Sequence, residues 1–311
     1  MSILDWISKK VQNFSGETER RQFVNDIKCE FEKFRTELVC EIPVINEAVN
    51  KFNERIMSIN KIRMEHISKQ IIRLSDFLGK FGHIKSIGYY NPEHQTAIIE
   101  IPKRQFENTE NYIAKLDWSK EQIYEKSVKD GAFKTREETR KQNLSMREWL
   151  DKFKVETAHT LEQLKTLKIT IKQNQQIADL YIFCITFISK YIEEIIIPEL
   201  DVVEAFFQVV KIKNELVVRN NLQEFGLTDS IFAVETLNNT PYKKHYLFVK
   251  NVFMFYIISC KIYNTPILTQ LLSEDIKETD ANYEIMKNHR DALLQQKDAI
   301  ISNLSFPRSQ A

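Results

Sequence analysis

The chain has 311 residues, of which 43% are hydrophobic and 28% are charged, a composition typical of a folded protein with its own core rather than of a disordered chain. Its 44 lysine and arginine residues nearly balance 43 aspartate and glutamate residues, which argues against a strongly basic nucleic-acid binder. Only six glycines occur, where average usage gives roughly 22. Since phosphate-binding loops and β-rich folds need glycine, we expect a mainly all-α protein.

The first 16 residues predict one short amphipathic helix. Between Ser2 and Phe14 the apolar side chains fall on one face, while Asp5 and Lys9 lie opposite. Such a helix either docks on the chain's own bundle, which we expect, or lies in a membrane interface with its tryptophan near the lipid headgroups. The residues of this docking or membrane face are Ile3, Leu4, Trp6, Ile7, Val11 and Phe14.

Residues 17–78 predict a long, coiled-coil-like helix, because apolar residues recur there at steps of three and four. The pattern keeps its phase across Pro43, so we expect a kink or a tight helix–helix joint at that residue. Large aromatic residues favour packing within the chain over a narrow two-stranded zipper. The helix-packing seam comprises Phe23, Ile27, Phe31, Phe34, Leu38, Ile45, Val49, Phe52 and Ile56.

Residues 79–104 differ in composition, with three of the six glycines and two of the seven prolines. Two apolar runs flank the turn-like tetrapeptide Asn91–His94, and the second run is rich in β-branched residues. We therefore predict a β-hairpin or an extended loop here. Residues 105–130 predict another helix, which completes a first region of long helices from residue 17 to residue 130.

Residues 133–304 predict a second region, a helical bundle with more deeply buried helices. Residues 180–188 and 245–263 are apolar nearly all round, which is typical of core helices, and each uninterrupted apolar run is shorter than a membrane span. We expect Pro198 to interrupt the helical run. Residues 305–311 are expected to form a frayed tail.

The first long element also predicts an elongated helical bundle. Its 62 residues would span roughly 90 Å as one helix. A compact globule of this chain length has a radius of gyration of only about 20 Å. The helix must therefore fold back at Pro43 or the molecule must be long, and we expect the second.

The sequence holds no local motif for catalysis or metal binding, such as GxGxxG, GxxxxGK[ST] or HExxH. His83 and His94 could meet across the predicted hairpin, although two exposed polar residues explain them better. The tripeptide from His289 to Asp291 matches a kinase catalytic loop, but it lies in a predicted helix without a preceding glycine-rich loop. Glu204 stands among apolar residues, and we expect it to face water. We predict no catalytic residue, no bound metal and no cofactor.

These patterns favour a non-catalytic helical scaffold or interaction protein that acts through protein–protein contacts, as a subunit of a larger assembly. Its partner would be another protein or a second copy of the chain, and not a nucleic acid. Four cysteines outside any metal-binding spacing, and an N-terminus without a signal-like apolar run, favour the cytoplasm. A peripheral position on a membrane surface is the second setting.

Two alternative functions stay open. The order of long helix, small hairpin and long helix over residues 17–190 is similar in outline to that of α-helical pore-forming toxins, and this resemblance implies a membrane-associated protein. The element between the helices is less apolar here than in those toxins. The third hypothesis is an enzyme built on a helical bundle, whose polar cluster would lie in residues 133–304.

Liposome flotation separates the membrane hypothesis from the others. If the N-terminal helix is an anchor, the intact protein floats with vesicles and deletion of residues 2–14 abolishes flotation, because the apolar face is lost. An intact protein that stays at the bottom of the gradient contradicts the membrane hypothesis.

Overall fold

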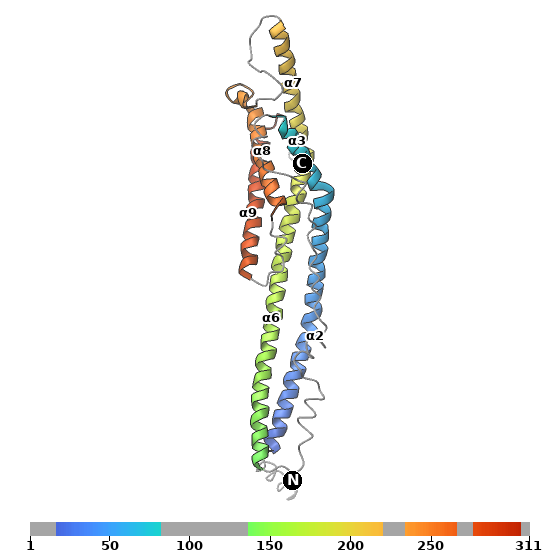
Figure 1. The fold of residues 1–311 in the computed structure, drawn as a ribbon, viewed down its shortest axis with the longest axis vertical. Coiled ribbons are helices and arrows are strands. Elements are labelled where there is room, and N and C mark those ends of the chain that lie inside the picture. The colour runs from blue at the N-terminus through green and yellow to red at the C-terminus, as the bar shows by residue number, and fades with distance from the viewer. Residues whose placement is uncertain (1–16, 82–135, 220–233, 266–275, 306–311) are drawn as a thin grey trace. The chain divides into compact units, whose positions relative to one another are not determined.

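The computed structural model describes residues 17–81, 136–219, 234–265 and 276–305. Within these ranges every regular element is helical, which confirms the predicted all-α bundle. Figure 1 shows the helices in the order of the chain.

The chain divides into two compact units. The first combines Met1–Lys51 with Lys103–Ile171, and the second combines Phe52–Pro102 with Lys172–Ala311. The two longest helices contribute residues to both units. Each unit therefore contains a stretch of the same two helices, and the second unit adds helices of its own.

The first long helical run continues through its only proline. Helix α2 spans Glu17–Ile62, a π-helical turn η1 follows at Arg63–Ile67, and α3 spans Ser68–Gly79. The tight joint considered at Pro43 does not occur, since Pro43 lies inside α2. Its ring is exposed, so the carbonyl that loses its helical hydrogen bond can face water.

The second long helical run also continues through a proline. Helix α6 spans Arg136–Tyr191, a π-helical turn η4 follows at Ile192–Ile196, and α7 spans Ile197–Arg219. The expected interruption at Pro198 is therefore wrong, because Pro198 lies in the first turn of α7. A proline lacks the N–H that would bond to the carbonyl four residues earlier, and its ring crowds that carbonyl. For Pro198 this carbonyl belongs to Glu194, which lies in the wider π turn η4.

In the first unit, α2 and α6 run parallel. Asn143 Nδ2 donates a hydrogen bond to Glu19 Oε2 at 3.2 Å, and Lys168 Nζ donates to Glu41 Oε2 at 3.0 Å. From the first contact to the second, the position advances toward the C-terminus in both helices. The two residues of each contact are 124 and 127 positions apart in the sequence, so the helices point the same way. This register keeps the apolar stripes of the two helices opposed along the unit.

Aromatic residues fill the contact between these two helices. The ring of Phe34 meets the edge of Phe153 at 6.3 Å, a favourable edge-to-face geometry. Phe153 has no exposed surface. The neighbouring cluster consists of Ile27, Phe31, Leu150 and Phe153, with Phe23, Met146 and Trp149 packed against it.

The structure buries most of the helix-packing seam. Its members from Ile27 to Ile56 are buried, while Phe23 is half-buried. The members up to Val49 belong to the first unit, and Phe52 and Ile56 belong to the second. The steps of three and four therefore identify the inward face of α2.

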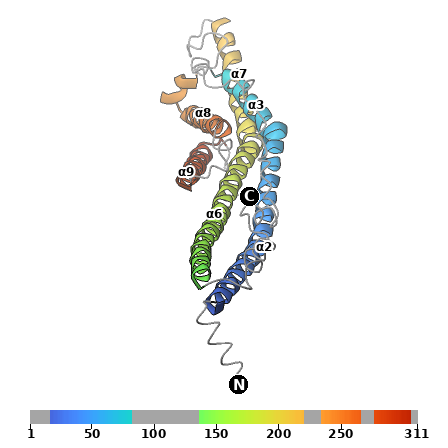
Figure 2. The same cartoon turned by 60° about the horizontal axis from the view of Figure 1, so that its bottom comes forward.

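Among the described residues, four helical segments build the second unit. They are the end of α2 with η1 and α3, the end of α6 with η4 and α7, α8 at Lys243–Tyr263 and α9 at Ile276–Ile301. A short 3₁₀ helix, η5, spans Val234–Asn239 before α8. Helices α8 and α9 lie side by side in both views (Figures 1 and 2).

The two long helical runs stay parallel in the second unit. Arg55 Nε contacts Asp179 Oδ1 at 2.6 Å, and Lys80 Nζ contacts Glu204 Oε2 at 2.7 Å. Each pair is separated by 124 residues. A constant separation over 25 residues means that both runs advance in the same direction at the same rate.

Helix α9 is also parallel to α6, whereas α8 is antiparallel to it. Tyr191 Oη donates to the Lys297 carbonyl at 3.3 Å and the Ser305 amide donates to Glu199 Oε1 at 2.7 Å, both across 106 residues. The contacts between α6 and α8 run in the opposite order. The earlier residue of α6, Tyr181, contacts Tyr263 near the end of α8, whereas the later Tyr191 contacts Phe255, which comes before Tyr263. One reversed helix thus packs among three that share a direction.

Helix α8 is the one described helix that is long and apolar enough to cross a membrane. Half of its most apolar window is buried inside the protein. Its buried side chains, Phe248, Val252 and Phe255 among them, belong to the large core of the second unit. Contacts with three neighbouring helical segments account for that apolar composition.

Several predictions lie outside the described residues. These are the N-terminal docking face, nearly all of the hairpin and the helix at 105–130, together with residues 306–311 of the tail. The elongated outline likewise stays a prediction, which small-angle scattering can test.

Truncating Phe153 should destabilise the first unit. Phe153→Ala removes a fully buried ring and should lower the free energy of unfolding by about 3–5 kcal/mol. The control is Val155→Ala, two residues away and 69% exposed, which should change stability by less than about 0.5 kcal/mol. Urea denaturation followed by circular dichroism measures both, and equal effects would contradict the packing described here.

Candidate interaction surface

A ladder of three aromatic rings follows one side of α6. The rings of Phe183 and Phe187 stack at 6.1 Å with an interplanar angle of 11°, and those of Phe187 and Tyr191 stack at 5.3 Å and 14°. Residues four apart lie one helical turn apart on the same face, which brings their side chains together. The ladder is therefore built locally by the sequence of α6.

Exposure rises steadily along this ladder. Tyr191 is buried, packs against Phe255 of α8 at 5.4 Å and is hydrogen-bonded to α9. Burial, and secondarily the nearby Asp298 carboxylate, raises the pKa of the Tyr191 hydroxyl. Phe187 is half-buried, and Phe183 is 44% exposed. The ladder thus starts in the core and ends at the surface.

The ladder borders an open groove of about 440 Å³, which we call the α6 groove. Its described lining comes entirely from α6 and η4, and most of it is apolar. Lys190 and Glu194 supply its charges. The lining residues are Ile182, Phe183, Thr186, Phe187, Lys190, Tyr191 and Glu194.

The opposite side of α6 is held in the core. Arg63 Nη1 donates to Tyr181 Oη at 3.3 Å, and Tyr181 Oη donates to the Tyr263 carbonyl at 3.4 Å. The Arg63 guanidinium also lies over the Tyr263 ring, 4.6 Å from its centre. Because Arg63 opens the π turn η1, these contacts tie that turn to α6 and α8. Burial is the main reason that the pKa of Tyr181 is raised.

Cys184 follows Phe183 directly but points into the core. Burial raises the pKa of its thiol to about 12, against a smaller opposing effect of Arg290. Residues adjacent in a helix project about 100° apart, so one step along α6 passes from the surface to the interior. The exposure of Phe183 is therefore a property of its helix face, not of a loosely packed region.

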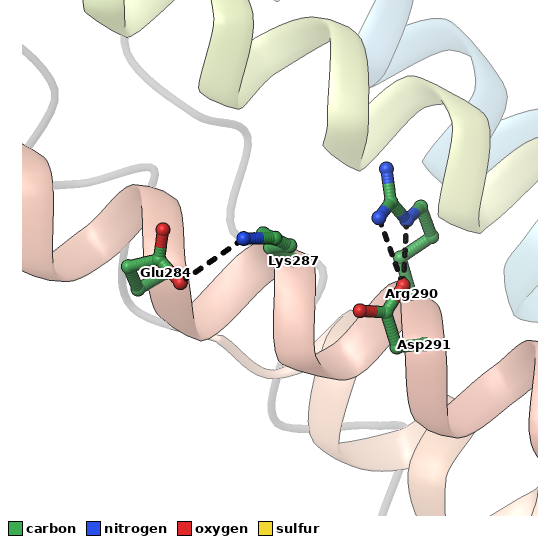
Figure 3. Close-up of polar contacts among 4 residues, drawn as sticks. All are labelled: Glu284, Lys287, Arg290 and Asp291. Atoms are coloured by element: carbon green, nitrogen blue, oxygen red, sulfur yellow. Dashed lines mark hydrogen bonds and ion pairs between the residues drawn. The ribbon is translucent and has the colours of Figure 1, made fainter.

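The polar residues singled out in the sequence have structural partners. Glu204 Oε2 accepts a hydrogen bond from Lys80 Nζ at 2.7 Å, and the Glu204 side chain is one-fifth exposed. The two residues form an ion pair at the end of α3. Arg290 donates through Nε and Nη2 to Asp291 Oδ1 at 2.9 and 2.8 Å. Figure 3 shows this pair on α9 beside a second one between Glu284 and Lys287.

His289 precedes this pair and is half-buried. Burial, followed by the nearby Lys261 cation, lowers the pKa of its imidazole. The tripeptide from His289 to Asp291 lies within one helix, as expected. In the part of the chain that the structure describes, no three histidine, cysteine or carboxylate side chains gather as metal ligands, and His83 and His94 lie outside that part.

Sequence reasoning missed the exposure of Phe183 and the half-exposure of Phe187, because residues 180–188 are apolar nearly all round and predict a buried helix. The missed signal is a helical stripe that crosses the apolar run. Asp179 precedes Phe183 by four residues. Lys190 follows Phe187 by three residues and Glu194 follows Lys190 by four, so all of them lie near one side of the helix. Charged residues at both ends of that stripe mark the face as a solvent-facing one.

Comparisons of the chain with protein-family models, with curated proteins and with solved structures find no match. The candidate surface is therefore defined by its own geometry: an aromatic ladder that reaches the surface at Phe183, an open groove and charged residues at the ends.

Thiol labelling tests the orientation of α6. In the native protein a maleimide should modify Cys29 and Cys40, which are exposed, and should leave Cys184 and Cys260 unmodified until denaturant is added. Burial raises the pKa of both inner thiols to about 12, so little thiolate forms. Peptide mass spectrometry measures the labelling. Rapid native labelling of Cys184 would show that the inward face is wrongly assigned.

Proposed function

We propose that this chain is a helical interaction protein that works by contact rather than by catalysis, and that a helix of a protein partner docks in the α6 groove. The observation that carries the proposal is Phe183, a 44% exposed ring stacked on Phe187 at the mouth of the groove. Aromatic side chains in partly preformed pockets are the usual anchors of protein interfaces.

The dimensions of the groove suit a helix. Its lining extends from Ile182 to Glu194, about 18 Å along the helix axis, or about three turns of a partner helix. An amphipathic helix that enters such a groove presents apolar residues one turn apart. Phe183 and Phe187 are themselves one turn apart, so their spacing matches that of the expected ligand.

The charges around the groove fit the usual anatomy of an interface. The apolar middle, from Ile182 to Phe187, is flanked by Asp179 on one side and by Lys190 on the other. Interfaces commonly have an apolar centre and a charged rim that fixes register. The rim here carries both signs, so it favours a partner that also carries both.

A membrane-associated role is the second candidate, favoured by the length and apolar character of α8. Half of the most apolar part of α8 already faces other helices of the second unit. A membrane role would require that packing to open, whereas the α6 groove is already open among the described residues.

Replacing the exposed Phe183 together with the half-buried Phe187 should abolish partner binding. Phe183→Ser with Phe187→Ser removes the anchors, and we expect the tagged protein in its native host to shift from a larger species to its single-chain mass. Matched controls are Val209→Ser and Met254→Ser, exposed apolar residues of the same unit, which should leave the elution unchanged. Size-exclusion chromatography with photo-crosslinking from position 183 provides the measurement. An unchanged elution and no crosslink from position 183 would contradict the proposal.

A further inference from the structure

We propose that the helix that fills the α6 groove is α6 of a second copy of this chain, packed antiparallel on the first. This inference rests on the proposed function, since it names the partner of the same groove. Its basis is the order of charged and apolar residues along the exposed stripe of α6.

That stripe has the spacing of a coiled-coil seam. Its residues recur at alternating steps of three and four, which keeps them on one side of the helix. Gln176, Asp179, Phe183, Lys190 and Glu193 are exposed, and Thr186 is half-buried. The buried residues between them, such as Cys184 and Ile188, project to other sides. The stripe is therefore a seam without a partner helix among the described residues.

An antiparallel copy makes this seam complementary to itself. With the two-fold axis between residues 184 and 185, Lys190 lies opposite Asp179 of the second copy, and the symmetry repeats the pair at the other end. Phe183 then lies opposite Thr186, and Phe187 opposite Ile182, so the centre is apolar. The outermost layer joins Glu193 to Gln176, which is uncharged and creates no repulsion.

The charges select this direction over a parallel one. In a parallel dimer each residue meets its own copy, so Lys190 would face Lys190 and Asp179 would face Asp179. Lys190 makes no ion pair with any described residue, whereas Asp179 binds Arg55 through Oδ1 at 2.6 Å. The second carboxylate oxygen of Asp179 can accept the lysine. Two ion pairs in the antiparallel arrangement thus replace two like-charge contacts.

The predicted dimer is small and therefore reversible. It buries about six layers of one helix per copy, less than the area typical of permanent dimers. Sedimentation equilibrium of the full-length protein should therefore show a monomer–dimer equilibrium that depends on concentration. Each charge layer occurs twice by symmetry, so a single substitution changes two contacts.

A charge-swap experiment tests the register. Lys190→Glu and Asp179→Lys should each weaken self-association by about tenfold or more, because each creates two like-charge contacts. An equimolar mixture of the two variants should associate as tightly as the wild type, since in the mixed dimer both layers again join opposite charges. Lys250→Glu, an exposed lysine on α8, is the control and should have no effect.

A second pair of variants keeps the test valid if Asp179→Lys does not fold because the ion pair between Asp179 and Arg55 is lost. Gln176→Lys places a cation opposite Glu193 of the second copy and should tighten the dimer several-fold, whereas Gln176→Glu should weaken it. Circular dichroism checks the fold of every variant.

The outcomes separate this inference from the proposed function. A protein that is monomeric at all concentrations, or a charge-swapped mixture that associates no better than either variant alone, overturns the antiparallel dimer. If the dimer is overturned but Phe183→Ser with Phe187→Ser still shifts the tagged protein from its native host to its single-chain mass, the groove binds a different protein. If that double variant has no effect either, both proposals are wrong.

Discussion

Parallel packing of two long helices, held in register by their apolar faces, is the constraint on which each unit depends. Ion pairs such as Arg55–Asp179 and Lys80–Glu204 report the register but are partly exposed, and such pairs contribute roughly 0–1 kcal/mol each. Truncating one buried aromatic ring such as Phe153 costs about 3–5 kcal/mol. The apolar faces therefore determine how the helices pair, and the charges adjust the alignment.

The direction of α8 follows from this arrangement. In the second unit α9 and both long helical runs point the same way, so their macrodipoles are aligned, and a reversed α8 among them is electrostatically favourable. A helix that contacts three neighbours must be apolar over most of its circumference. The composition that makes α8 resemble a membrane span is thus the one that a reversed helix packed against several neighbours requires, with Phe255 and Val252 in contact with the core.

Sequence spacing identified the inward face of α2 because a helical period repeats over many turns, and Ile27, Phe34 and Phe52 are all buried. The parallel direction of the helices was not predictable, since an apolar stripe packs equally well against a partner of either direction. The two π turns also left no clear signal, because Arg63–Ile67 has no proline and Pro198 suggests a break rather than a wider turn. Phe183 was assigned to the core because hydropathy averaged over a turn hides a single exposed ring.

Helix α6 therefore has two faces with different requirements. Cys184 and Tyr181 are fixed by the core, where a change of side-chain volume would be costly. Phe183 is free of that constraint, and a polar residue there would reduce apolar exposure at little cost to packing. Phe183 is exposed, stacked in line with Phe187 and flanked by opposite charges, and these features are the basis of the proposed contact outside the single chain. The proposed antiparallel dimer rests on a second feature of this face, the self-complementary order of its charges from Asp179 to Lys190.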